Sequence, residues 1–163
     1  MSRKSSLRWL TLGFVLLGLG WFYLPDCSPK SPEEQVRAAI QEVADGLGEA
    51  RLDHAMAPIS AAYLDEDGFN AAAVRGILFR ELQSRGPIQV ILGGIEVEFD
   101  PDGEHAEARF NAMLLEGLNP AALDLRANNA EAWAFIVDLA LEEGDWRITS
   151  HARRDVEPKD IFE

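Results

Sequence analysis

The stretch Glu131–Arg153 (EAWAFIVDLALEEGDWRITSHAR) decides the fold class of this chain. Apolar side chains alternate along its first half, the turn Glu142–Asp145 follows, and a second alternating segment begins at Trp146. An alternation with a period of two is typical of strands that bury one face. The stretch therefore predicts a β-hairpin, and the buried face of its first arm is expected to hold Trp133, Phe135, Val137, Leu139 and Leu141.

Unbroken alternation also assigns the residues of the second arm to two faces. Trp146, Ile148, Ser150 and Ala152 would share the buried face, and Arg147, Thr149, His151 and Arg153 the opposite face. His151 is therefore expected to point away from the core, and so is Asp138. An inverted strand phase would instead turn Asp138 inward, where it would become a candidate acid.

Three helices are predicted before the strands. Residues 31–34 (SPEE) combine an N-cap serine, a proline at the first helical position and the glutamate of a capping box. A second helix is expected to carry Met56, Ile59 and Tyr63 on one face. The third is expected to begin at the cap Asn70 and to end near Ser84, with Val74, Ile77, Leu78 and Leu82 as its buried stripe.

The pattern changes to strands after Gly86-Pro87. Ile88–Phe99 is expected to form one long strand, bent by a β-bulge at Gly93-Gly94, and His105–Leu115 returns antiparallel to it. Residues 116–130 break the pattern before the hairpin. The order of elements predicts an α+β, cone-shaped domain in which about three helices pack on a curved antiparallel sheet.

The N-terminal residues predict a membrane anchor. Residues 9–24 (WLTLGFVLLGLGWFYL) are apolar, basic residues precede them, and as a helix they would span about 24 Å. The basic side places the N-terminus in the cytoplasm and the domain outside the inner membrane. Lipidation at Cys27 is the alternative and signal cleavage the third, although Leu24–Asp26 lacks the small residues that both require.

These patterns divide the chain into an anchor and linker (residues 1–30), a domain (31–156) and a tail (157–163). The net charge is −13 although residues 1–30 are basic, so the domain is strongly acidic and is expected to bind no nucleic acid. The single cysteine excludes an internal disulfide and a cysteine-based zinc site. No metal site or cofactor is expected.

Residues 32–154 resemble the nuclear transport factor 2-like (SnoaL-like, cystatin-like cone) superfamily. The resemblance rests on the capped first helix, on Tyr63–Gly68, on Gly86-Pro87-Ile88 and on Gly144–Ile148. It implies a pocket between the helices and the concave face of the sheet. It also implies that members with enzyme activity project an Asp, His or Tyr into this pocket, and that members dimerise through the convex face.

The candidate pocket residues are Tyr63, Trp133, Asp138, Trp146 and His54. Each also has a structural interpretation, because a tyrosine or tryptophan on an apolar face often only packs its ring. His54 fits a surface position, and Asp65-Glu66-Asp67-Gly68 fits a solvated turn. The apolar inward face indicates either a filled core or a small apolar ligand.

The favoured function is a non-catalytic binding or protein-interaction module outside the membrane. Its partner would be a second copy of the chain or another envelope protein, and the candidate interface residues are Met113, Ala134 and Ile136. The alternative is a small-molecule enzyme or carrier that uses the mouth of the cone. Fold class alone does not distinguish these functions.

Overall fold

The computed structural model describes residues 30–116 and 130–157. The chain divides after Lys30 into two units, and every described helix and strand belongs to the second. The predicted anchor, Cys27 and most of the break at residues 116–130 lie outside the described residues. No helix within the described ranges has the length and apolar character needed to cross a membrane.

The first helix, α2 (Pro32–Gly48), begins at the predicted capping box. The backbone N–H of Glu34 donates to Ser31 Oγ at 3.2 Å, and the N–H of Ser31 donates to Glu34 Oε2 at 2.7 Å. Both groups lack a partner inside the helix, so this exchange satisfies them. α4 (Ala71–Arg85) begins with Asn70 as its N-cap. The predicted start of the first helix and the predicted bounds of the third are therefore confirmed.

The second helix, α3 (Leu52–Met56), is shorter than predicted, and Tyr63 lies in the loop that follows it. The prediction that Met56, Ile59 and Tyr63 share a helix face is wrong. The carbonyl of Pro58 accepts from the N–H of Ile148 at 2.8 Å, and the N–H of Ser60 donates to the Ile148 carbonyl at 2.9 Å. The backbone after α3 therefore pairs with the sheet and cannot continue a helix.

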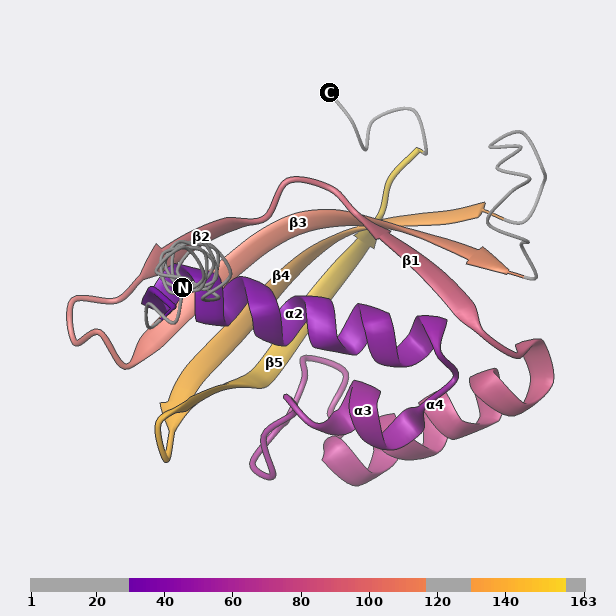
Figure 1. Cartoon of the computed structure of the whole chain (residues 1–163), viewed down its shortest axis with the longest axis horizontal. Coiled ribbons are helices and arrows are strands. Elements are labelled where there is room, and N and C mark those ends of the chain that lie inside the picture. The colour runs from indigo at the N-terminus through magenta and orange to yellow at the C-terminus, as the bar shows by residue number, and fades with distance from the viewer. Residues whose placement is uncertain (1–29, 117–129, 158–163) are drawn as a thin grey trace, which may run out of the picture. The chain divides into compact units, whose positions relative to one another are not determined.

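The strands form one antiparallel sheet in the order β1 (Ile88–Leu92), β3 (His105–Glu116), β4 (Ala130–Glu142), β5 (Asp145–Asp155). The predicted long strand is interrupted, because β2 (Glu96–Phe99) pairs with β3 separately from β1. The pairing register shifts by one residue across residues 93–95, which confirms the predicted bulge. Figure 1 shows α2, α3 and α4 on the same side of this curved sheet.

A second bulge lies between β4 and β5. Leu139 pairs with Ile148 but Asp138 pairs with Ser150, so Thr149 is the extra residue. The Thr149 hydroxyl donates to the Asp138 carbonyl at 3.2 Å. The extra residue reverses the side to which each following side chain of β5 points. His151 therefore lies opposite Val137. The predicted phase of the second arm is therefore correct up to Ile148 and wrong beyond it.

The main core lies between α2 and the inner face of the sheet. Val36 and Ile40 of α2 are buried against Ala106 and Ala108 of β3 and Leu139 of β4. The alanines of β3 allow the helix to approach the sheet closely.

Gly46 is the point of closest approach between α2 and α3, because an added Cβ would lie 2.2 Å from the backbone nitrogen of Ala55. We expect Gly46→Ala to lower the free energy of unfolding by about 2 kcal/mol, since the helices must separate to admit the methyl group. Gly76→Ala is the matched control. Its Cβ would meet no atom within 4 Å, so it should raise stability by about 0.5–1 kcal/mol. Urea denaturation measures both, and equal effects would contradict the packing argument.

Candidate functional site

A cavity of about 290 Å³ lies between α2, α4 and the inner face of the sheet. This volume is at the small end for ligand sites. No residue of α4 is fully buried, so the predicted buried stripe of this helix is only half-buried, and three of its four members face the cavity. Apolar side chains form most of the wall, among them Ile40, Val43, Val74, Ile77, Leu78, Leu92, Phe110, Trp133, Phe135 and Val137.

Three polar side chains meet at the wall of this apolar cavity. The hydroxyl of Tyr63 lies 3.2 Å from Asp65 Oδ2 and is also hydrogen-bonded to His151 Nδ1. Tyr63 is 3% exposed and Asp65 is 8% exposed. Buried polar groups are costly unless they are paired, and each of these three has a partner in the group.

Backbone pairing between the loop after α3 and β5 brings the three residues together. The N–H of Leu64 donates to the carbonyl of the bulged Thr149 at 3.0 Å, which places Tyr63 beside His151. Asp65 is fixed by the next turn, where its Oδ1 accepts from the N–H of Phe69 at 2.8 Å. The group is thus held by main-chain contacts on both sides.

The hydrogen bonds determine the tautomer of His151. A carboxylate only accepts hydrogen bonds, so the single hydroxyl proton of Tyr63 is donated to Asp65. The Tyr63 oxygen must then accept from His151, and Nδ1 of His151 carries the proton. Nε2 is left with a lone pair and has no hydrogen-bond partner within residues 30–116 and 130–157.

Burial sets the charge of the pair. Desolvation lowers the pKa of His151 below its ordinary value of 6.5 and outweighs the opposing effect of Asp65. Desolvation also raises the pKa of Tyr63, with a further increase from the negative charge of Asp65. At neutral pH the imidazole is therefore neutral and the phenol protonated. His151 Nε2 is in the form that can accept a proton.

Aromatic rings continue the wall from His151 towards Trp133. Phe110 and Phe135 stack with their centroids 5.4 Å apart, and Phe135 lies 5.9 Å from the His151 ring. Trp133 meets Phe135 edge-on at 6.2 Å. Flat rings at these separations form a surface suited to a planar apolar molecule.

Of the five candidate pocket residues, the structure places Tyr63 and Trp133 in the cavity wall. Trp146 is buried in the core, edge-on to Phe99 at 5.5 Å, and does not line the cavity. Asp138 accepts from the Ser150 hydroxyl at 2.6 Å and is exposed on the outer face, so the inverted phase is wrong. His54 lies on α3 beside Glu49, with 3.3 Å between Nδ1 and Oε2, away from the cavity.

His151 and Asp65 are the site residues that the sequence pattern missed. Unbroken alternation through Thr149 predicts an outward His151, and a one-residue bulge reverses that direction. The acidic sequence around Asp65 predicts a solvated turn, yet Asp65 is buried against Tyr63. The signal available in the sequence was the spacing of Tyr63 and Asp65, two residues apart, which suits an extended segment with both side chains on one side.

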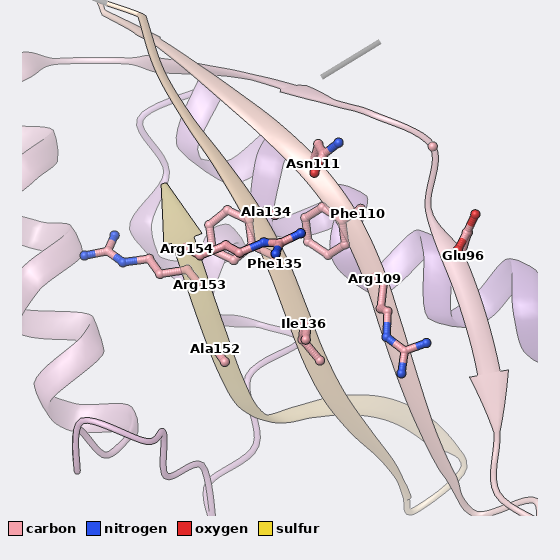
Figure 2. A pocket seen from close by; sticks show the side chains of 11 residues that line it. Glu96, Arg109, Phe110, Asn111, Ala134, Phe135, Ile136, Ala152, Arg153 and Arg154 are labelled. Carbon is pink, nitrogen blue, oxygen red and sulfur yellow. The ribbon is translucent and has the colours of Figure 1, made fainter. Parts of the chain in front are cut away.

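The three candidate interface residues lie on the outer face of the sheet. Ile136 is 43% exposed, Ala134 is partly exposed, and Met113 is 2% exposed because it packs in a small cluster with Leu115 and Ala132. A shallow hollow on this face is lined by residues of β3, β4 and β5 and of the segment around β2. Figure 2 shows their side chains, with Ile136 and Ala134 on β4 between Arg109 and Arg154.

One group with the spacing of a metal site occurs in the described part of the chain. It consists of Asp100, Asp102 and His105, all exposed, in the turn between β2 and β3. Asp102 already accepts from the backbone N–H of Glu104 at 2.9 Å and from His105 Nδ1 at 2.8 Å. These contacts stabilise the turn, and they account for the arrangement without an ion.

Comparisons with known proteins identify the fold. No family model matches the sequence, and no curated protein matches it significantly. A putative scytalone dehydratase from Novosphingobium aromaticivorans is similar in structure, with a TM-score of 0.63 at 9% identity over 77% of this chain and 84% of that chain.

A putative dehydratase of the nuclear transport factor 2-like family from Streptomyces avermitilis gives a TM-score of 0.62 at 15% identity, over 79% of this chain and 99% of that chain. Bd1075 from Bdellovibrio bacteriovorus gives 0.62 at 5% identity, and there the match covers 77% of this chain but only 41% of the larger chain. The chain therefore has the nuclear transport factor 2-like, cystatin-like fold, as the sequence resemblance predicted.

The proton positions at the site can be tested by NMR. We expect the imidazole of His151 to titrate below pH 6.5 as the Nδ1–H tautomer, since burial opposes its charge and Tyr63 accepts from Nδ1. His105 is the internal comparison and should titrate above 6.5, because Asp102 favours its charged form. Imidazole ¹⁵N shifts recorded against pH measure both. Tyr63→Phe should remove the tautomer preference of His151; its persistence would contradict the assigned hydrogen bonds.

Proposed function

We propose that this domain binds a small, largely apolar molecule in the inner cavity and that His151 exchanges a proton with it. Tyr63 and Asp65 would hold the imidazole in the tautomer that presents Nε2 to the ligand. The observation that carries the proposal is the Asp65–Tyr63–His151 hydrogen-bond chain. Tyr63 and Asp65 are buried, and His151, whose Nε2 has no hydrogen-bond partner in the described ranges, lines the cavity.

The free-energy cost of burial is the first argument that the Asp65–Tyr63–His151 hydrogen-bond chain has a role beyond packing. A tyrosine, a carboxylate and an imidazole are expensive to bury, and apolar side chains of similar size would fill the same space. Groups whose pKa values are shifted by burial inside a cavity are typical of catalytic sites. The pKa of His151 is lowered and that of Tyr63 raised in this way.

The chemistry that fits is removal of a proton from carbon next to a carbonyl group. A neutral imidazole of moderate basicity is a suitable general base, and the imidazolium that forms can return the proton at another position or to a leaving hydroxyl. Isomerisation and loss of water are the two reaction classes that follow. Proteins of similar structure named as putative dehydratases support the second class.

An enolisable apolar ketone tests this proposal without knowledge of the natural substrate. We expect the full chain, in neutral detergent, to accelerate exchange of the α-protons of 2-tetralone with D₂O, followed by loss of their NMR signals. His151→Asn should lower the rate about 100-fold or more, the usual contribution of a general base. The rate should fall as pH falls through the pKa of His151, because only the neutral imidazole accepts a proton.

His54→Asn is the matched control, since His54 lies outside the cavity. It should leave exchange unchanged, and an equal loss in both variants would contradict the assignment of His151 as the base. Binding of the ketone with no accelerated exchange would support a carrier or other non-catalytic module in place of an enzyme.

The predicted anchor at residues 9–24 remains part of the proposal. It would hold the domain at the outer surface of the inner membrane, where the substrate would be taken from the extracytoplasmic side. The apolar run and the basic residues before it support this location, with lipidation at Cys27 as the alternative mode of attachment.

A second proposed role is association through the outer face of the sheet. Ile136 is an exposed large apolar side chain that lines a hollow of this face together with Ala134 and Ala152, and an exposed apolar patch is a common feature of protein contacts. The partner would be a second copy of the chain or an envelope protein. Ile136 lines only the outer hollow, although Phe110, Phe135 and Arg153 border both the hollow and the inner cavity.

We expect Ile136→Asp to convert an associated form of the full chain to a smaller one, since a charge in an apolar contact leaves water at a cost. Light scattering on detergent-solubilised protein measures the mass. Leu64→Asp is the control, because Leu64 is 59% exposed but does not line the hollow. An unchanged mass in the Ile136 variant would exclude this contact.

A further inference from the structure

We infer that the cavity takes an anionic ligand, a planar ring compound that carries a carboxylate or phenolate, and that Arg153 binds the anionic group at the mouth. The inference rests on the proposed function of the cavity and names its ligand class. Its starting point is the bulge at Thr149, because the same register shift that turns His151 inward places Arg153 opposite Phe135, on the inner face.

Arg153 has no carboxylate partner in the described part of the domain. It shares this property with Arg80 and Arg154, but of these three arginines only Arg153 lines the inner cavity. No ion pair of Arg153 is found within residues 30–116 and 130–157, whereas Arg37, Arg51, Arg75, Arg85, Arg109 and Arg147 each pair with an acid. The domain is acidic, so partners are abundant. An arginine left unpaired at a cavity is available to a ligand.

The guanidinium of Arg153 is nevertheless held in place. It lies over the ring of Trp133 at 4.5 Å from the centroid, and Trp133 Nε1 is fixed by donation to Asp155 Oδ1 at 2.8 Å. A cation–π contact of this kind engages the positive charge and leaves the N–H donors of the guanidinium available. These donors match the two oxygens of a carboxylate.

The spacing of Arg153 and His151 limits the shape of the ligand. The two residues are two apart on one strand, which corresponds to roughly 7 Å. The aromatic wall of Phe135 and Trp133 runs between and beside them. A flat ring system can therefore rest on this wall with its anionic group at Arg153 and a reactive carbon near His151 Nε2.

The acidic groups around this mouth oppose an anion and define the alternative. Asp67 is exposed and lines the cavity, Asp155 lies two residues from Arg153, and Asp65 is engaged by Tyr63 and the Phe69 N–H. If Asp67 controlled selection, the cavity would prefer a cation. An anionic ligand would form a bidentate charged hydrogen bond with the guanidinium of Arg153. This bond is stronger than the repulsion from a solvated carboxylate, so we expect the cavity to prefer the anion.

Three probes of one shape separate these cases: 2-naphthoate, neutral 2-naphthamide and cationic 2-naphthylmethylammonium. We expect the full chain, in neutral detergent, to bind naphthoate about tenfold more tightly than naphthamide, with the ammonium weakest. Arg153→Met should reduce the ratio between naphthoate and naphthamide to below twofold. Arg154→Met, which removes a neighbouring charge from the outer face, should preserve it. Shifts of the Trp133 indole N–H signal measure each Kd.

The outcomes distinguish the ligand class from the function on which it rests. Equal affinity for naphthoate and naphthamide, or preference for the ammonium, overturns the anion assignment and leaves the cavity as a ligand site. A preference that survives Arg153→Met overturns the role of this arginine. Failure of all three probes to bind counts against the proposed function itself.

Discussion

The site depends on backbone pairing between the loop after α3 and β5 at the Thr149 bulge. The carbonyl of Thr149 accepts from Leu64, and Ile148 exchanges two hydrogen bonds with Pro58 and Ser60. These contacts end α3 early and bring Tyr63 alongside β5, while the extra residue turns His151 towards it. Main-chain hydrogen bonds define this geometry closely, because each requires alignment of two peptide groups. The polar group is thereby preorganised, as proton transfer requires.

The close packing of α2 and the looser packing of α4 explain why a cavity remains beside the Asp65–Tyr63–His151 group. On one side, α2 is held close to the sheet by alanines of β3 and by the contact of Gly46 with α3. On the other side, α4 has no fully buried residue and turns a half-buried apolar face to the cavity. Elements with few buried contacts are the ones that open at low cost, so under the proposed function a ligand would enter on the side of α4.

The two faces of the sheet have different chemical characters. The inner face combines aromatic rings with His151 and Arg153 and suits a small planar molecule. The outer face combines Ile136 with charged side chains and suits a protein contact. One sheet can serve both because successive residues of a strand point to opposite faces.

Local patterns in the sequence determined most of the fold. The capping box at Ser31, the cap at Asn70 and the final hairpin follow from short-range physics: unsatisfied end groups at the helix starts and alternation along the strands. The bulge at Gly93-Gly94 follows from a glycine pair that interrupts a strand pattern. The site depended on tertiary structure. Period-two alternation cannot reveal a bulge whose extra residue is an ordinary threonine. Nor can it show that Tyr63 meets His151, because these residues are 88 apart in sequence and only the pairing of separate segments brings them together.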